Sequence, residues 1–136
     1  MKNNELSAFR IFFIVAALWN LAGGIPGYYF SVDTFQMFFG KELVDPLMIS
    51  IYKGAWGTTL LYFFGYLFVA FNPEKHTGIV ILGVIGKIFF AASLLKLYLA
   101  GLTTTVVMAV VIGDSLFTLF LLFFLARMLF LRKAII

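Results

Sequence analysis

Residues 77–100 read TGIVILGVIGKIFFAASLLKLYLA, and after the residues GLT a second apolar run, TTVVMAVVIGDSLFTLFLLFFLARMLFL, fills residues 104–131. A helix of about 20 residues, rising about 1.5 Å per residue, crosses a hydrocarbon core about 30 Å thick. The connection at residues 101–103 is so short that the two helices must form a tight antiparallel hairpin. The stretch therefore predicts two neighbouring membrane-spanning helices.

Two further apolar runs, at residues 11–30 and 47–71, bring the expected spans to four in a chain of 136 residues. Only 12% of the residues are charged and 63% are apolar, whereas a soluble domain carries about 25% charged residues. Outside the spans almost nothing remains for a soluble domain. The sequence therefore predicts one all-α transmembrane domain over residues 1–136, an integral membrane four-helix bundle.

This composition excludes a soluble enzyme, a disordered chain and a free-standing nucleic-acid binder. The absence of Cys excludes disulfides and thiolate metal sites. The single histidine, His76, cannot form a two-histidine metal or haem site, and no nucleophile or phosphate-loop motif is present. We therefore expect no metal and no cofactor and assign no catalytic residue; an enzyme stays open as a third alternative, because a Lys–Asp pair can move protons.

Short motifs indicate where the spans begin and end. Asp45-Pro46 combines a capping carboxylate with a proline suited to the first helical position, and Asn72-Pro73-Glu74 repeats the signal before the third span. Gly101 is expected to end that span, and Thr103 to cap the fourth. In the first span the segment Gly23–Gly27, which contains a proline, is expected to unwind or kink.

Residues 31–46 form the longest connection, and Val32, Phe35, Phe38 and Phe39 recur in it at helical spacing between polar residues. That pattern is typical of a short amphipathic helix lying on a membrane surface. A loop packed over the mouth of the bundle is the alternative, and the sequence leaves both open.

The basic residues are divided unequally between the two ends of the expected bundle. The end opposite both termini, the outer end, holds Lys41, and it holds Lys53 only if that side chain reaches out. The end with both termini holds Lys2, Arg10, Lys75, Arg127, Arg132 and Lys133. Because Lys and Arg accumulate on the cytoplasmic side, we expect both termini in the cytoplasm (N-in, C-in) and the protein in a bacterial cytoplasmic (inner) membrane.

Five polar side chains fall near the middle of the expected spans, where an unpaired charge is costly. Lys87 and Asp114 each lie ten residues into their spans, or about 15 Å deep at about 1.5 Å per residue. Folding the hairpin brings them together as an ion pair or as a pair that shares a proton. Asn20, Thr58 and Thr118 complete a polar layer to which all four spans contribute.

This layer has two interpretations, and both stay open. A buried ion pair with hydrogen-bonded neighbours can simply fix the register of the helices. Alternatively, the layer is a functional site, and the protein is a membrane binding protein or accessory subunit that encloses a hydrophobic or amphipathic ligand. A small oligomeric channel or carrier for an ion or small solute is the alternative function.

Closer to the outer end, Lys53 and Trp56 are expected to line a mouth above Asp114, with Trp56 also suited to the interfacial aromatic belt. Gly23 and Gly27 form a small-xxx-small pair of the kind found where membrane helices pack. The expected partners are membrane lipid, a hydrophobic small molecule, and a second copy or another membrane protein, but not nucleic acid.

The layout resembles small four-helix bacterial membrane proteins of the DoxX-like kind, and more distantly the eukaryotic EXPERA bundle proteins. The similar features are the size, four spans joined by short hairpins, and the step Gly86-Lys87 within a membrane helix. EXPERA proteins bind sterol-like ligands with paired inner carboxylates, whereas this chain has one mid-membrane acid, Asp114. The resemblance therefore does not imply sterol-isomerase chemistry.

Overall fold

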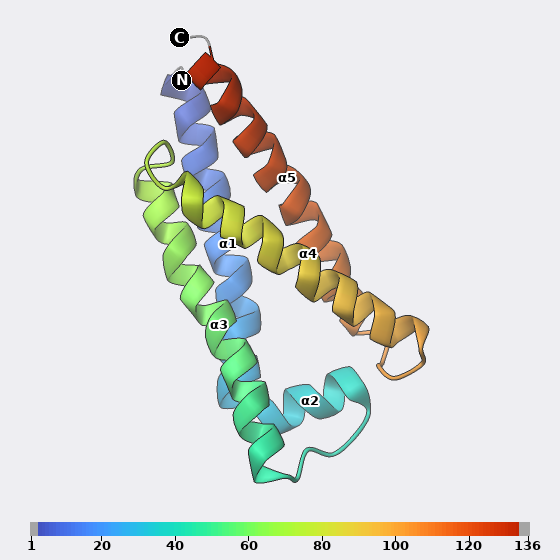
Figure 1. Cartoon of the computed structure of the whole chain (residues 1–136). Coiled ribbons are helices and arrows are strands. Elements are labelled where there is room, and N and C mark those ends of the chain that lie inside the picture. Colours follow the sequence, from blue (N-terminus) through green and yellow to red (C-terminus); the bar gives the residue numbers. More distant parts are fainter. Residues whose placement is uncertain (1–2, 134–136) are drawn as a thin grey trace.

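A computed structural model describes residues 3–133 of the chain. This part is all-helical, as predicted (Figure 1). Its five helices are α1 (Asn3–Tyr29), α2 (Ser31–Phe39), α3 (Pro46–Phe71), α4 (Thr77–Leu99) and α5 (Val107–Lys133). Among these described residues, four helices (α1, α3, α4 and α5) are long and apolar enough to cross a membrane.

The four long helices are arranged as two antiparallel pairs, α1 with α3 and α4 with α5. The pairs meet at the end of the molecule that holds both termini and diverge toward the opposite end, where α2 lies (Figure 1). We call these the joined end and the open end. Because the pairs diverge, the space between them must be filled by large side chains or remain a cavity.

At the joined end all four long helices contribute to one core. Phe13 of α1, Tyr66 of α3, Val80 of α4 and Phe124 of α5 are each fully buried there. The rings of Phe13 and Phe124 meet edge to face, with centroids 5.0 Å apart, a geometry that aromatic pairs favour. This core holds the two pairs together at one end.

At the open end α2 connects the two pairs. The Thr104 amide donates a hydrogen bond to the Phe38 carbonyl (2.7 Å), and its hydroxyl donates one to the Met37 carbonyl (2.6 Å). These bonds satisfy carbonyls at the end of α2 that have no partner within the helix. Of the two expectations for residues 31–46, the helix is confirmed, and it also lies over the open end.

Two of the predicted helix ends are confirmed. The Asp45 carboxylate accepts hydrogen bonds from the Leu47 amide (2.8 Å) and the Met48 amide (3.1 Å), so it caps α3. Gly101 has the left-handed φ of 70° expected of a residue that ends a helix.

The predicted start of α4 at Thr77 is confirmed, but the expected cap at Asn72 is wrong: Asn72 ends α3, and its carbonyl accepts a hydrogen bond from the Lys75 amide. In the last connection Thr103 caps nothing; its hydroxyl is buried and has no partner among the described residues. A turn occupies residues 73–75 before α4, whereas the Thr104 amide bonds to the Phe38 carbonyl of α2 and α5 begins only at Val107.

Of the two expectations for Gly23–Gly27, to unwind or to kink, the unwinding is wrong, since α1 continues through Pro26 to Tyr29. Proline removes one hydrogen bond from a helix, and close packing against α3 keeps this segment helical. A Cβ atom at Gly27 would overlap the Trp56 ring, and one at Gly23 would lie 3.2 Å from it. The glycines therefore let the indole of Trp56 lie directly on the α1 backbone.

A candidate ligand cavity with a buried ion pair

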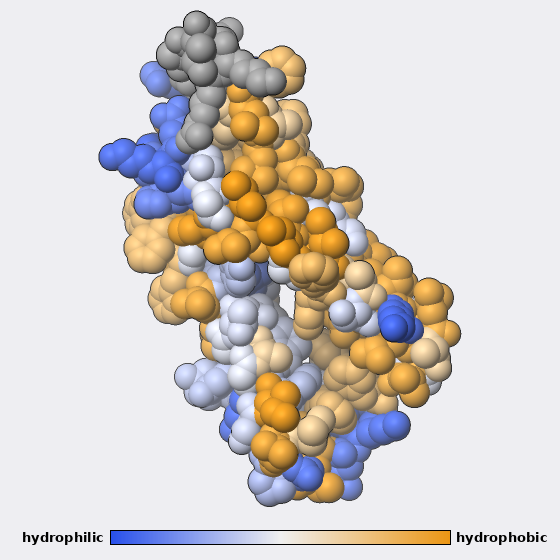
Figure 2. Space-filling view, viewed as in Figure 1, coloured by the Kyte–Doolittle hydropathy of each residue, from blue (hydrophilic) through white to orange (hydrophobic). Residues whose placement is uncertain are grey.

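A cavity of about 500 Å³ lies between the two diverging helix pairs. All five helices contribute to its wall, and α2 borders it at the open end through Thr34, Met37 and Phe38. Figure 2 shows an opening in the molecular surface between α3 and α4. The cavity is therefore reached from the side of the molecule, between two of the long apolar helices.

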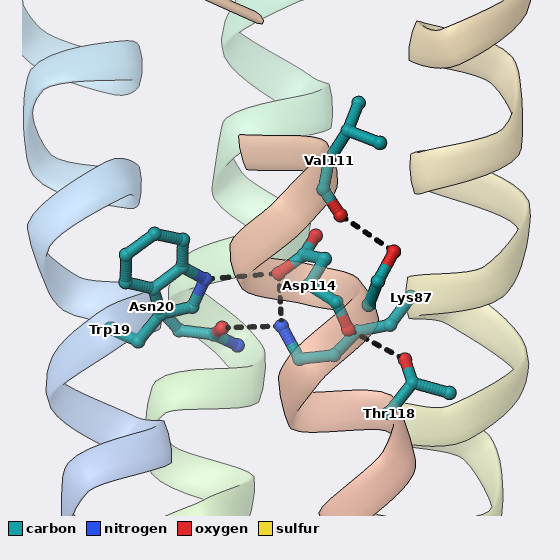
Figure 3. Close-up of polar contacts among 7 residues, drawn as sticks. Trp19, Asn20, Lys87, Val111, Asp114 and Thr118 are labelled. Atoms are coloured by element: carbon teal, nitrogen blue, oxygen red, sulfur yellow. Dashed lines mark hydrogen bonds and ion pairs between the residues drawn. The ribbon is translucent and has the colours of Figure 1, made fainter. Parts of the chain in front are cut away.

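Lys87 of α4 and Asp114 of α5 form an ion pair in the wall of this cavity, with 2.6 Å between Nζ and Oδ1 (Figure 3). Their exposed fractions are only 7% and 5%. Nζ also donates to Asn20 Oδ1 of α1 at 3.2 Å, and Trp19 Nε1 donates to Asp114 Oδ1 at 2.9 Å. These four side chains connect α1 to the α4–α5 pair where the helices begin to diverge.

The arrangement neutralises both buried charges. Each ion faces an opposite charge and accepts or donates a further hydrogen bond, which offsets part of the cost of removing it from water. Nζ of Lys87 also lies 5.6 Å from the centroid of the Phe117 ring, a distance at which a cation is attracted by the ring face. Each buried charge therefore has a partner within the protein itself.

Two polar atoms of this cluster still have hydrogen-bonding capacity. Within the described residues, Asp114 Oδ2 and Asn20 Nδ2 make no hydrogen bond, and both residues line the cavity. The orientation of the Asn20 amide follows from its partner, because an ammonium group can only donate and so must face the oxygen. These two atoms therefore offer the cavity one free acceptor and one free donor, beside the third hydrogen of the Lys87 ammonium group.

The other residues predicted for the polar layer are placed differently. Thr118 is buried, and its hydroxyl donates to the Asp114 carbonyl one turn away in α5 (2.7 Å), so it does not line the cavity. Thr58 lines the cavity, while its hydroxyl donates to the Gly54 carbonyl of its own helix (3.2 Å). The structure thus brings Lys87, Asp114 and Asn20 together, with Thr58 on the same cavity but outside their network.

The two residues predicted for an outer mouth also separate. Trp56 lines the cavity and is buried against α1. Lys53, one turn earlier in α3, is half-buried and does not line the cavity. Of the two residues, Trp56 therefore forms part of the cavity wall and Lys53 does not.

Sequence reasoning missed Trp19, which donates to Asp114 and lines the cavity. Its position beside Asn20 was the available signal, because an indole N–H within a membrane span needs an acceptor. Trp19 lies close to α5 because Gly113 has no side chain; a Cβ there would overlap the Trp19 ring.

Among the described residues, no group of His, Asp and Glu could hold a metal ion.

Tyr66 was missed as well, and it is an unusual member of the wall. Its side chain is fully buried, and its hydroxyl has no hydrogen-bond partner among the described residues. A buried polar group without a partner costs about 1–3 kcal/mol. The hydroxyl lies against Gly83 of α4, where a Cβ would be 2.5 Å away.

We therefore expect Tyr66→Phe to raise the free energy of unfolding by about 1 kcal/mol, because the ring packing stays and the unpaired hydroxyl is removed. Denaturation of the purified protein in mixed micelles measures the change. Tyr62→Phe is the control on the same helix, because the Tyr62 hydroxyl is not among the buried groups without a partner. A loss of stability in Tyr66→Phe alone would mean that the hydroxyl has a partner, such as a water molecule or a ligand.

Comparison with protein-family models, with curated proteins and with solved structures finds no match for this chain. Its function is therefore inferred from the cavity and the side chains that line it.

Proposed function

We propose that this chain is an integral protein of the bacterial cytoplasmic membrane that holds a hydrophobic or amphipathic small molecule between its two helix pairs. In this proposal the four long helices span the bilayer as a bundle, with both termini in the cytoplasm. The DoxX-like resemblance of the layout agrees with it but stays a prediction.

The distribution of charge supports the orientation. Arg10, Lys75 and Arg127 all belong to the joined end, where Arg127 pairs with Glu5 and links α5 to α1. Basic residues close to the ends of spans are retained on the cytoplasmic side. The joined end is therefore assigned to the cytoplasm, and the open end with α2 to the opposite face.

The observation that carries the function is the cavity itself. Its volume of about 500 Å³ falls within the range of about 300–1,000 Å³ typical of small-molecule sites. Its wall is mostly apolar and aromatic, with a few convergent polar groups around Lys87 and Asp114. Ligand sites combine these two properties, because the apolar wall supplies affinity and the polar groups fix the orientation.

Native mass spectrometry of protein extracted gently from its own membrane tests the proposal. We expect a retained small molecule in the wild type and its loss in Gly86→Leu, which places a side chain in the cavity. Gly78→Leu is the matched control, because Gly78 is on the same helix, does not line the cavity, and has open space where a side chain would begin.

Retention of the same molecule by Gly86→Leu and wild type would contradict a ligand site in this cavity. A wild-type protein that carries no small molecule and assembles into a ring would instead favour the channel or carrier alternative, which flux assays in liposomes would then test. A stable complex with a second membrane protein would favour the accessory-subunit form of the proposal.

A further inference from the structure

We infer that the molecule held in the cavity is an uncharged amphiphile, whose head accepts and donates hydrogen bonds at the Lys87–Asp114 pair and whose apolar body extends toward the bilayer between α3 and α4. This inference rests on the proposed function and specifies the chemical class of the ligand.

The charge of the cavity wall excludes a charged head. Among the described residues that line the cavity, the charged side chains are Lys87 and Asp114, and they neutralise each other. An anionic or cationic head would add a charge without a counter-ion in a mostly apolar space, where such a charge is strongly unfavourable. A neutral head leaves the balance of the pair unchanged.

The hydrogen-bonding atoms define what the neutral head must offer. Asp114 Oδ2 can only accept while the carboxylate is ionised, and Asn20 Nδ2 can only donate. Both residues line the cavity, and neither atom has a partner among the described residues. A hydroxyl group satisfies both requirements at once, because it donates one hydrogen bond and accepts others.

The rest of the wall fits an apolar body. Trp56 of α3 and Phe90 of α4 face each other edge to face, with ring centroids 6.2 Å apart, and both line the cavity. The opening in Figure 2 lies between the same two helices. In the proposed membrane orientation this opening faces lipid, so a long chain can extend out of the cavity without meeting water.

Three probes with the same alkyl chain and different heads test the charge class: tetradecanol, tetradecanesulfonate and tetradecyltrimethylammonium. The charged heads are permanent, so proton uptake cannot neutralise them. Binding is measured in phosphatidylcholine nanodiscs by the fluorescence of the two tryptophans, Trp19 and Trp56, which both line the cavity. We expect tetradecanol to bind at least about tenfold more tightly than either charged probe at equal mole fraction in the bilayer.

Single substitutions should reverse this preference. Asp114→Asn leaves Lys87 as an unpaired cation and should favour the sulfonate, whereas Lys87→Met leaves an unpaired carboxylate and should favour the ammonium probe. The double variant Lys87→Met/Asp114→Asn restores a neutral wall and should again prefer tetradecanol. If the single variants do not fold, the wild-type ranking and the double variant still decide the inference.

The chain length of the probe tests the opening. Eicosanol, which has the same head and a longer chain, should bind within about threefold of tetradecanol, because the extra chain lies in the bilayer. A sharp loss of binding with the longer chain would show a closed cavity and overturn the route between α3 and α4.

Equal binding of all three heads by the wild type, or a preference for a charged head, would overturn the inference on charge. Failure of the inference is distinguishable from failure of the proposed function. If Gly86→Leu still abolishes a natural adduct, the cavity binds a ligand of another class. If no adduct exists and no probe binds, the proposed function fails too.

Discussion

Asp114→Ala is expected to lower the free energy of unfolding by about 3–5 kcal/mol, the loss typical of breaking a buried ion pair from one side. The reason is that Lys87 Nζ would keep only the Asn20 oxygen as a hydrogen-bond partner and would lose its counter-ion. Its exposed fraction of 7% leaves it little contact with water in which to be solvated. Unfolding of wild type and variant in mixed micelles of increasing denaturing detergent measures the difference.

The matched control for this prediction removes both charges. Lys87→Met combined with Asp114→Leu should recover most of the lost stability, because well-packed apolar residues often replace a buried ion pair without loss. Trp19 would then lack its acceptor, so recovery should be incomplete. If Asp114→Ala lowers the free energy of unfolding by less than about 1 kcal/mol, the prediction is wrong. Water in the cavity would then solvate Lys87 to the same extent as an exposed ion.

Gly27→Ala is expected to lower the free energy of unfolding by about 1–3 kcal/mol, the range for overpacking of a tight interior. The added methyl group would overlap Cγ and Cδ2 of Trp56, where the ring joins Cβ. These ring atoms cannot move aside as the end of a flexible side chain would. Trp56 must therefore move, and with it the contact between α1 and α3. The same denaturation assay and the fluorescence of Trp56 report the change.

Gly54→Ala on α3 is the control, because no atom lies within 4 Å of the position that its Cβ would occupy. Alanine is favoured over glycine inside a helix by about 1 kcal/mol, so this variant should be as stable as the wild type or more stable. Equal stability of Gly27→Ala and Gly54→Ala would show that α1 and α3 are not in close contact at Trp56.

The sequence predicted the features that depend on distance along one helix. The contact between Lys87 and Asp114 followed from counting residues on both sides of a three-residue connection, because helix rise is constant. The cap at Asp45 followed from local chemistry in the same way. One depends on a single hairpin and the other on a single helix start, and the structure contains both.

The features that the sequence could not predict depend on how the helices are rotated against each other. The four long helices are apolar on nearly every side, so hydrophobic periodicity does not show which face looks inward. For this reason Trp56 was assigned to the membrane interface and is instead buried against the glycines of α1. The same limit hid Trp19 as the second partner of Asp114.

The divergence of the helix pairs was also beyond sequence reasoning. At the open end α2 is hydrogen-bonded to Thr104, a residue 65 or more positions away in the chain, and a contact at that separation has no local sequence signal. Only the amphipathic pattern of residues 31–46 was visible, and it left open a surface helix and a loop packed over the mouth of the bundle.

Because α4 and α5 follow each other directly in the chain, the two buried charges belong to one newly made hairpin. Synthesis delivers α1 and α3 first, so Lys87 and Asp114 leave the ribosome after them and 27 residues apart. Each alone would oppose insertion at the centre of a helix by about 2.5–3.5 kcal/mol. In the proposed membrane protein, the two charges paired within the hairpin would enter the lipid as a neutral unit, before α1 packs against it with Trp19 and Asn20. The order of the chain thus places both buried charges on one hairpin, in which each neutralises the other.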